Sequence, residues 1–441
     1  MSQEFVDANN RQLDLIALFV SGKWGVTPIG RKPDSAPKVL LLGYNGANNT
    51  GAEAKLLATI VDIRSLLGPS AMLTVPSLDV AKLRRYLREE EGLKIVKVPT
   101  TYRRTIRRLV REHDIIVLVE GSCYIETFTK ALLDAYLWGT RCAAKLGRPC
   151  IAYAVDSGQV SMASEGKIRE DASKTDLIIM RTFAGAQRMR EWGVTAPIEV
   201  AADTAFLFKP DPADADLLER ELPSSRVVGI AAVDFHLFPV VPRIWGRRSR
   251  CYKWPFYFAW SEERRKAAAK LAQDFAELAD WVIEEHDRSI ALMCMESLDD
   301  ALANDILDRM KHPERARIFS ATKYNASQMA SVLRGLDLLI TSRYHAGALS
   351  LEGHVPQVAI AHDVRLADLY EEIGMKEEFF FDHVDPDLFE KVRARAERLL
   401  KDPGMVREML DRAHREQVDR AHRARQLTGE FLRSRGWIVN L

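Results

Sequence analysis

Short apolar runs alternate with longer amphipathic stretches along most of the chain. Runs such as residues 38–43 and 114–119 are too short for helices, and their many Val, Ile and Leu residues are typical of strands buried on both faces of a sheet. A first series of such strands is predicted at residues 38–43, 71–75, 93–98, 114–119, 150–155, 176–181 and 198–201. Because helical stretches lie between most of them, the pattern predicts a parallel sheet covered by helices.

A second series of strands follows a polar, proline-bearing stretch at residues 210–225. It is predicted at residues 227–233, 289–293, 315–319, 336–341 and 355–361. We therefore expect an α/β protein of two Rossmann-like domains, and divide the chain into an N-terminal helix and loop (1–37), an N-terminal domain (38–210), a C-terminal domain (226–385) with an insertion (234–260), and C-terminal helices (386–441).

The C-terminal helices are rich in charge and carry the sequence DRAHR twice, at residues 411–415 and 419–423. An offset of eight residues is close to two helical turns, so the two copies share one face. We expect a solvated charge ladder there rather than a surface for nucleic acid.

Composition narrows the class of protein. The 441 residues are 47% hydrophobic and 28% charged, as expected for a soluble globular protein, and 63 Lys and Arg nearly balance 62 Asp and Glu. Because the net charge is close to zero, no overall electrostatic field would attract nucleic acid. The five cysteines lack metal-ligand spacing, which favours reduced thiols in a cytoplasmic protein and argues against structural zinc. No apolar segment reaches the length of a membrane span, so membrane contact would be peripheral.

Residues 336–365 form the most informative segment, a predicted strand–helix–strand unit. Ser342 is expected to be the N-cap of the helix, with Arg343 and His345 in its first turn. Backbone N–H groups, a guanidinium and an imidazole would meet there, at the edge of the sheet where open α/β folds bind ligands. Asp363 and Arg365 follow the second strand at the same edge, so the unit predicts a site for phosphate or carboxylate.

Polar side chains also follow several other predicted strands. The loop after the first strand, at residues 43–58, is rich in Gly and Asn, and either a ligand loop or a structural turn explains it. The residues at the next strand ends could face a cleft or only cap the following helices. The candidates are Asn45, Asn48, Asn49, Glu53, Glu120, Ser122, Arg181 and Asp203.

The insertion at residues 234–260 mixes aromatic and basic side chains. Asp234 and His236 lie at its start, where a cleft residue would be found, and residues 243–260 then contain five cations and seven aromatic residues. Such a mixture suits a sugar, an anionic acceptor or a membrane surface with a lipid-linked substrate. A loop folded back on the cleft or a dimer contact explains it equally well, and the oligomeric state stays open, a homo-oligomer included.

Taken in order, these segments resemble the polysaccharide pyruvyl transferase family. The matching pieces are GYNGANNTGAEA, the strand end at Glu120 and Gly121, Arg181 in LIIMRTF, ADTAFLF with Asp203, and SRYHAGALSLEGHVPQVAIAHDVR. The resemblance implies two domains in the GT-B arrangement and transfer of a pyruvyl group from phosphoenolpyruvate to sugar hydroxyls. It gives His345 a catalytic role with Arg181 and Arg343 as anion-binding partners, and it requires no metal or cofactor beyond the donor substrate.

The N-terminal half departs from the family pattern. Ala52 and Glu53 stand where members usually carry an acidic pair, and EGSCYIE replaces a glycine-rich run ending in aspartate. We expect a pyruvyl transferase that acts in the cytoplasm on a cell-envelope or lipid-linked saccharide, with peripheral membrane contact through residues 243–260. A GT-B glycosyltransferase that uses a nucleotide sugar and a non-catalytic binding module on the same fold are the alternatives. The sequence does not identify the acceptor.

Overall fold

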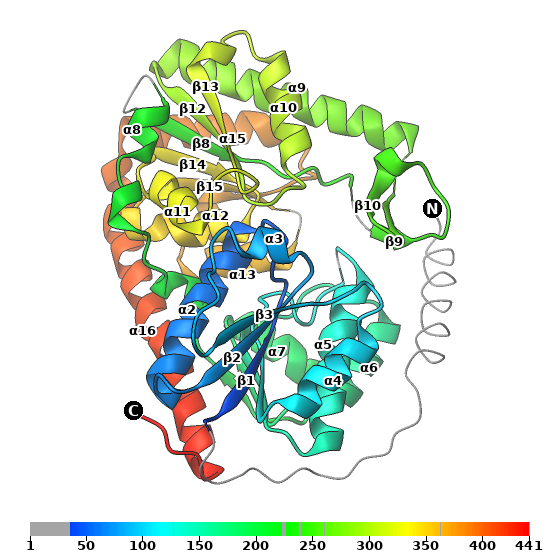
Figure 1. The fold of residues 1–441 in the computed structure, drawn as a ribbon. Coiled ribbons are helices and arrows are strands. Elements are labelled where there is room, and N and C mark those ends of the chain that lie inside the picture. Colours follow the sequence, from blue (N-terminus) through cyan, green and yellow to red (C-terminus); the bar gives the residue numbers. More distant parts are fainter. Residues whose placement is uncertain are drawn as a thin grey trace.

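The computed structural model describes residues 36–126, 128–222, 226–237, 240–259, 261–361 and 363–440. The predicted helix and nearly all of the predicted loop within residues 1–37 lie outside this part of the chain. Two α/β halves are stacked one above the other in Figure 1, and each is built on its own parallel sheet. Within the described residues, no helix is long and apolar enough to cross a membrane.

The N-terminal half contains a seven-stranded sheet in the order β3-β2-β1-β4-β5-β6-β7. All seven predicted strands are present. Their bounds are β1 (Lys38–Leu42), β2 (Met72–Ser77), β3 (Leu93–Lys97), β4 (Ile115–Leu118), β5 (Cys150–Val155), β6 (Leu177–Met180) and β7 (Ile198–Val200). Side chains alternate across the sheet, so Leu40 and Leu42 pack in one core whereas Val39 and Leu41 pack in the other. Both faces are buried, which explains the unbroken apolar runs.

Helices cover both faces of this sheet. They are α2 (Thr50–Leu67), α3 (Val80–Leu83), α4 (Arg103–Glu112), α5 (Lys130–Leu146), α6 (Met162–Ala172) and α7 (Phe183–Glu191), followed by the 3-10 turns η1 (Thr204–Leu207) and η2 (Pro212–Asp214) and by α8 (Leu217–Glu221). Leu137 of α5 packs with Leu40, and Leu56 of α2 packs with Leu41.

The C-terminal half repeats the same strand order, counted from its own first strand. Its sheet runs β13-β12-β8-β14-β15-β16. The strands are β8 (Val227–Ala231), β12 (Ser289–Cys294), β13 (Ala316–Ser320), β14 (Leu338–Thr341), β15 (Gln357–Ala361) and β16 (Phe380–Asp382). The three-residue edge strand β16 was not predicted, because so short a segment carries no periodic signal. In both sheets the order reverses beside the first strand, where α/β folds form their ligand crevice.

Helices and turns complete the C-terminal half. They are α9 (Glu262–His286), α10 (Asp300–Arg309), η4 (Pro313–Arg315), α11 (Ala326–Arg334), α12 (Tyr344–Ser350), η5 (Leu351–Gly353), α13 (Val364–Glu372), α14 (Lys376–Phe379), α15 (Leu388–Lys401) and η6 (Pro403–Val406). Phe275 of α9, Leu366 of α13 and Val392 of α15 share one core with the sheet.

The insertion forms a small antiparallel sheet of its own, beside the two halves in Figure 1. Its strands are β9 (Val240–Pro242), β10 (Cys251–Lys253) and β11 (Phe256–Phe258), with the turn η3 (Arg248–Arg250) before β10. It leaves the C-terminal half after β8 but is attached to the N-terminal half. The Val240 N–H donates to the Phe128 carbonyl at 2.9 Å, and Lys253 Nζ donates to the Leu78 carbonyl at 2.9 Å.

The long helix α16 (Arg407–Ser434) packs on both halves. Ala413 and Ala421, the alanines of the two DRAHR copies, lie in the C-terminal core, whereas Ala424 lies in an N-terminal one. Arg420 donates to the Ala201 carbonyl at 2.6 Å and to Glu372 at 2.8 Å. The expected charge ladder is therefore present only on the outer side of the helix, where Arg412, Asp419 and Arg423 are exposed and Arg415 pairs with Asp411. The alanines of both copies are buried, so the inner side of the helix packs on the two halves.

The first turn of α2 joins the two halves near the cleft. The Thr50 N–H donates to the Met295 carbonyl at 2.9 Å, and Glu53 Oε2 accepts the Ala326 N–H at 3.1 Å. Glu53 is 1% exposed, and burial raises the pKa of its carboxyl to about 8. A carboxyl group thus lies in the interface in its protonated form up to nearly neutral pH.

We expect Glu53→Gln to stabilise the protein at alkaline pH. Below pH 4.5, the ordinary pKa, the carboxyl group is protonated in both the folded and the unfolded protein, so its burial does not oppose folding. As pH rises from 4.5 through about 8, the unfolded protein ionises first, and this contribution to stability is lost. Since glutamine does not ionise, the difference in unfolding free energy between variant and wild type should grow from near zero at pH 4.5 to about 4 kcal/mol at pH 8. Denaturant titrations at several pH values measure it. The exposed control Glu90→Gln should show no such trend, and a difference independent of pH would refute the explanation.

Candidate active site

A cavity of about 130 Å³ lies where the carboxyl ends of the two sheets face each other. Residues from both halves line it: Tyr44, Asn49, Gly51, Glu120, Ser122, Phe128, Leu132, Met295, Glu296, Ser342, Arg343, Tyr344, His345, Asp363, Arg365 and Leu366. The structure thus brings together eight of the residues expected at the site: Asn49, Glu120, Ser122, Ser342, Arg343, His345, Asp363 and Arg365. They come from loops after β1, β4, β14 and β15, which surround the two switch points.

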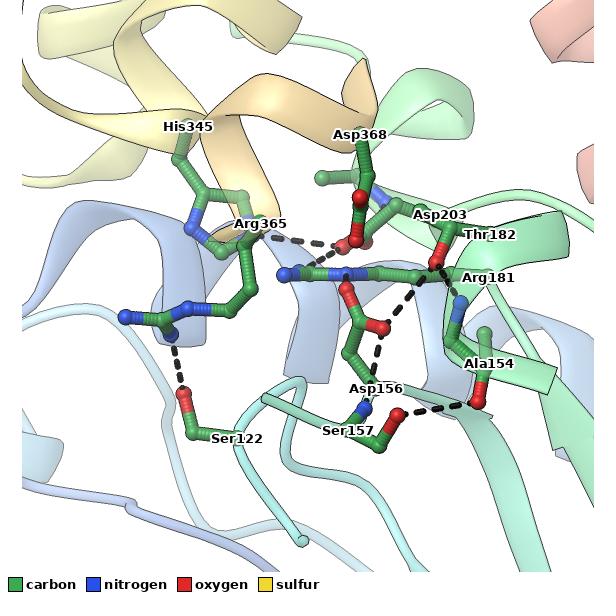
Figure 2. Close-up of polar contacts among 12 residues, drawn as sticks. Ser122, Ala154, Asp156, Ser157, Arg181, Thr182, Asp203, His345, Arg365 and Asp368 are labelled. Carbon is green, nitrogen blue, oxygen red and sulfur yellow. Dashed lines mark hydrogen bonds and ion pairs between the residues drawn. The ribbon is translucent and has the colours of Figure 1, made fainter. Parts of the chain in front are cut away.

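His345 enters the cavity from the first turn of α12, and its side chain is 17% exposed. Its Nε2 lies 3.4 Å from Asp203 Oδ2, and Figure 2 shows the two side chains directed toward each other. Burial lowers the pKa of His345, while the Asp203 carboxylate opposes that shift. The lowered pKa favours the neutral imidazole, and the Asp203 carboxylate lies where it can stabilise the protonated form.

Asp203 belongs to a fully buried group of charges behind His345. Arg181 Nη1 donates to Asp203 Oδ2 at 2.6 Å, and Arg181 Nε donates to Asp156 Oδ2 at 2.8 Å. Lys55 Nζ lies 3.8 Å from Asp203 Oδ1 and donates to the Ala154 carbonyl at 2.5 Å. Burial by itself would raise the pKa of Asp203, but the cations around it hold that pKa well below the usual range. Asp203 thus stays a carboxylate.

Arg181 does not line the cavity, as its predicted contact with an anion would require. Its side chain is 1% exposed, and its guanidinium lies 3.7 Å from the centre of the Tyr344 ring. Arg181 therefore supports the wall that carries Tyr344 and His345, and we correct the expectation of direct contact accordingly.

Arg343 lines the cavity and is held by two carboxylates from the loop after β12. Its Nε donates to Asp299 Oδ2 at 3.0 Å, its Nη2 donates to Asp299 Oδ1, and its Nη1 lies 3.4 Å from Glu296 Oε2. Arg343, and not Ser342, occupies the N-cap position of α12, and it makes no side-chain capping bond. The prediction for Ser342 is wrong because Thr341 Oγ1 accepts the Arg343 N–H at 2.9 Å and so forms the turn instead.

Glu296 is a cavity residue that the sequence interpretation missed. Asn49 and Tyr44 hydrogen bond to it, and burial raises the pKa of its carboxyl although Arg343 opposes the shift. The Tyr44 hydroxyl also contacts that of Tyr252 in the insertion. Since Glu296 follows strand β12 directly, the same search of strand ends that found Glu120 would have found it.

Arg365 of the C-terminal half reaches across the cavity to a residue of the N-terminal half. It donates from Nη1 to Ser122 Oγ at 2.6 Å, as Figure 2 shows, and from Nε to Asp363 Oδ1 at 3.3 Å. Glu120 Oε1 accepts the Ser122 N–H at 3.1 Å and orders the loop that meets it. A ligand that enters here can contact both domains through these side chains.

Five other candidates lie away from the cavity wall. Asn45 donates to the Pro76 carbonyl at 3.1 Å, and Asn48 Oδ1 accepts from Arg85 at 2.8 Å, so both order the loop itself. Glu53 is buried in the domain interface, as described above. Asp234 accepts the His236 N–H at 2.9 Å in the turn that begins the insertion. The residues Asn45, Asn48, Glu53, Asp234 and His236 are thus not among those that line this cavity, and the structure does not bring them together with His345 and Arg343.

Two Rossmann-like domains with a histidine and two arginines in the cleft between them define a protein of the GT-B fold. The polysaccharide pyruvyl transferase family model matches residues 69–364, which is more than half of the chain, and the protein belongs to that family. No curated protein sequence shows significant similarity to it. In the described part of the chain, no group of three or more His, Cys, Asp or Glu side chains is arranged to hold a metal ion.

Solved structures of the GT-B type resemble the fold. Anabaena HepE in complex with UDP has a TM-score of 0.56 at 13% identity, over 90% of this chain and 100% of that one. Neisseria meningitidis UDP-GlcNAc 2-epimerase bound to UDP-GlcNAc has a TM-score of 0.57 at 10% identity, over 90% and 100%. The Methanocaldococcus jannaschii UDP-GlcNAc 2-epimerase has 0.54 at 13% identity, over 83% and 93%. These likenesses confirm the predicted GT-B arrangement.

Gly51 is expected to tolerate no side chain, because His345 occupies the space beside it. A Cβ at Gly51 would lie 1.9 Å from His345 Nδ1, although the residue is helical and alanine suits helices. Gly51→Ala should displace the imidazole toward solvent and raise the pKa of His345, measured by NMR titration of the imidazole protons. Gly166→Ala, at a helical glycine with open space around it, is the control and should leave the titration unchanged. An unaltered His345 titration in Gly51→Ala would contradict the packing described.

Proposed function

We propose that the protein transfers a pyruvyl group from phosphoenolpyruvate to hydroxyl groups of a saccharide, and that the saccharide is a lipid-linked or other cell-envelope sugar. The observation that carries this proposal is the His345–Asp203 pair beside Arg343 in the interdomain cavity of a chain that belongs to the pyruvyl transferase family. The reaction needs cations for a carboxylate and a departing phosphate, and a group that moves protons.

The donor is assigned to the part of the cavity that Arg343 and Arg365 line. Each guanidinium offers planar donors that match a carboxylate or phosphate. Glu296 beside Arg343 would repel an anion when ionised, but its raised pKa favours the neutral form. Donor binding is thus coupled to protonation of Glu296.

His345 is assigned the proton transfers. Protonation of the methylene carbon converts it to a methyl group and leaves positive charge on the adjacent carbon, which an acceptor hydroxyl attacks. Loss of phosphate and attack by a second hydroxyl complete the ketal, and the two hydroxyl protons balance the one added to carbon and the one taken by phosphate. Asp203 stabilises the imidazolium form of His345 during these steps, while Arg181 and Lys55 fix Asp203 in place.

The acceptor is assigned to the N-terminal side of the cavity and to the insertion. Ile244, Trp245 and Trp254 are 71%, 73% and 59% exposed, and Arg247 and Arg248 lie near them in the sequence and are exposed too. Aromatic side chains among arginines suit the interface of an anionic membrane. We therefore propose a cytoplasmic enzyme that touches the membrane peripherally through residues 243–260.

Separate calorimetric titrations with phosphoenolpyruvate and with UDP test the proposal. Binding of phosphoenolpyruvate, followed by phosphate release on addition of saccharides, supports pyruvyl transfer. Binding of UDP alone would support instead a glycosyltransferase, and the absence of both would support a non-catalytic module.

We expect His345→Ala to lower turnover by about a hundredfold to ten-thousandfold, the usual range for a positioned acid or base. Affinity for phosphoenolpyruvate should change little, because the arginines remain. Phosphate release and calorimetry measure the two effects. The exposed His312→Ala serves as the control and should keep normal turnover. Near-normal turnover in His345→Ala would remove the histidine from the mechanism.

The affinity for phosphoenolpyruvate should fall as pH rises through the raised pKa of Glu296, because the ionised carboxylate repels the anionic donor beside Arg343. In Glu296→Gln this part of the pH dependence should disappear. Calorimetry at several pH values compares the two proteins, and the comparison cancels the donor's own titration. Identical pH profiles would show that Glu296 does not face the donor. Glu314→Gln, which alters an exposed carboxylate, is the control.

A further inference from the structure

A second cavity, of about 90 Å³, lies in the N-terminal half under the insertion. Its walls come from the ends of β2 and β3, from α5 and from the strands of the insertion. Pro76 lies in β2, Val98 directly follows β3, and Ala135 lies in α5. Tyr252 and Phe256 belong to the insertion. The insertion crosses from the C-terminal half, binds residues 78 and 128 and so supplies one wall of the cavity.

The interior of this cavity is apolar. Three of the polar side chains at its edge already have partners: Ser77 donates to the Asn45 carbonyl at 3.2 Å, Thr129 accepts the Ala131 N–H at 3.3 Å, and Lys253 donates to the Leu78 carbonyl at 2.9 Å. Apolar cavities hold water poorly, and one of about 150 Å³ in another protein binds benzene. A cavity of this kind suits a few carbon atoms of an apolar ligand.

The apolar cavity adjoins the candidate active site directly. Tyr44, Phe128 and Leu132 line both spaces, so one side of each of these residues faces His345 and Arg343 and the other faces the apolar walls. The Tyr44 and Tyr252 hydroxyls contact each other at this boundary. A ligand with a polar head in the first cavity can therefore place an attached chain in the second.

We propose that this second cavity binds the first carbons of an alkyl or isoprenoid chain attached to the acceptor saccharide. That the saccharide is the acceptor rests on the proposed function, whereas the chain site rests on the cavity itself. The exposed Ile244, Trp245 and Trp254 belong to the same insertion that covers the cavity, and they extend the apolar surface toward solvent, where the rest of such a chain would lie.

Calorimetry with n-alkyl β-D-glucosides from methyl to octyl, in the absence of donor, tests the chain site. Affinity should rise by about fourfold per methylene, the gain expected for complete burial, until the cavity is full. The heat-capacity change should become more negative along the series. Equal affinities along the series would overturn the proposal, as would a preference for phenyl glucoside over alkyl glucosides of similar size.

Variants that fill the cavity test whether the dependence of affinity on chain length arises there. Ala135→Phe, and the smaller change Ala131→Leu in case the first does not fold, should abolish the dependence on chain length. Ala144→Phe lies on the exposed side of the same helix α5 and should retain it. Retention of the chain-length effect in both filled variants would place the chain elsewhere and overturn the assignment.

A titration of phosphoenolpyruvate into the same proteins separates the two proposals. If phosphoenolpyruvate binds while chain length has no effect, the chain site is wrong and the donor assignment stands. If chain length governs affinity while phosphoenolpyruvate does not bind, the chain site stands and pyruvyl transfer is the wrong reaction.

Discussion

The candidate site depends on the ion pairs that the buried carboxylate of Asp203 makes. This carboxylate lies at the end of the N-terminal sheet, fully buried, and contacts Arg181, Lys55 and His345. A single charge in such a place is costly, and removal of any partner leaves another charge without balance. The group therefore holds its geometry, and it transmits that geometry to His345 and to the Tyr344 ring that covers Arg181.

Both domains are needed to complete the site. Arg365 of the C-terminal half binds Ser122 of the N-terminal half, Thr50 binds the Met295 carbonyl, and α16 packs on both cores. Asp203 and His345 likewise come from opposite halves. A change in the angle between the domains would thus alter the distance between His345 and Asp203, and with it the pKa of the imidazole.

The insertion gives the two sides of the cleft different characters. On the side of Arg343 and Arg365 the walls are charged, whereas under Tyr252 and Phe256 they are apolar. Tyr44 stands between the two spaces. Such a division suits a ligand with an anionic or polar head and an apolar tail, and neither sheet could provide it without the crossing of the insertion to the N-terminal half.

The sequence by itself determined the elements and the segment that carries the chemistry. Short apolar runs predicted all strands of both sheets except β16. The ends of the predicted strands indicated His345, Arg343 and Arg365 as site residues, because parallel strands bring their carboxyl ends to one edge of the sheet. Only the tertiary structure decided which side chains face the cavity. Burial and partners place Arg181 behind the wall, Glu53 in the interface and Glu296 beside Arg343, and such contacts between distant residues leave no periodic signal in the chain.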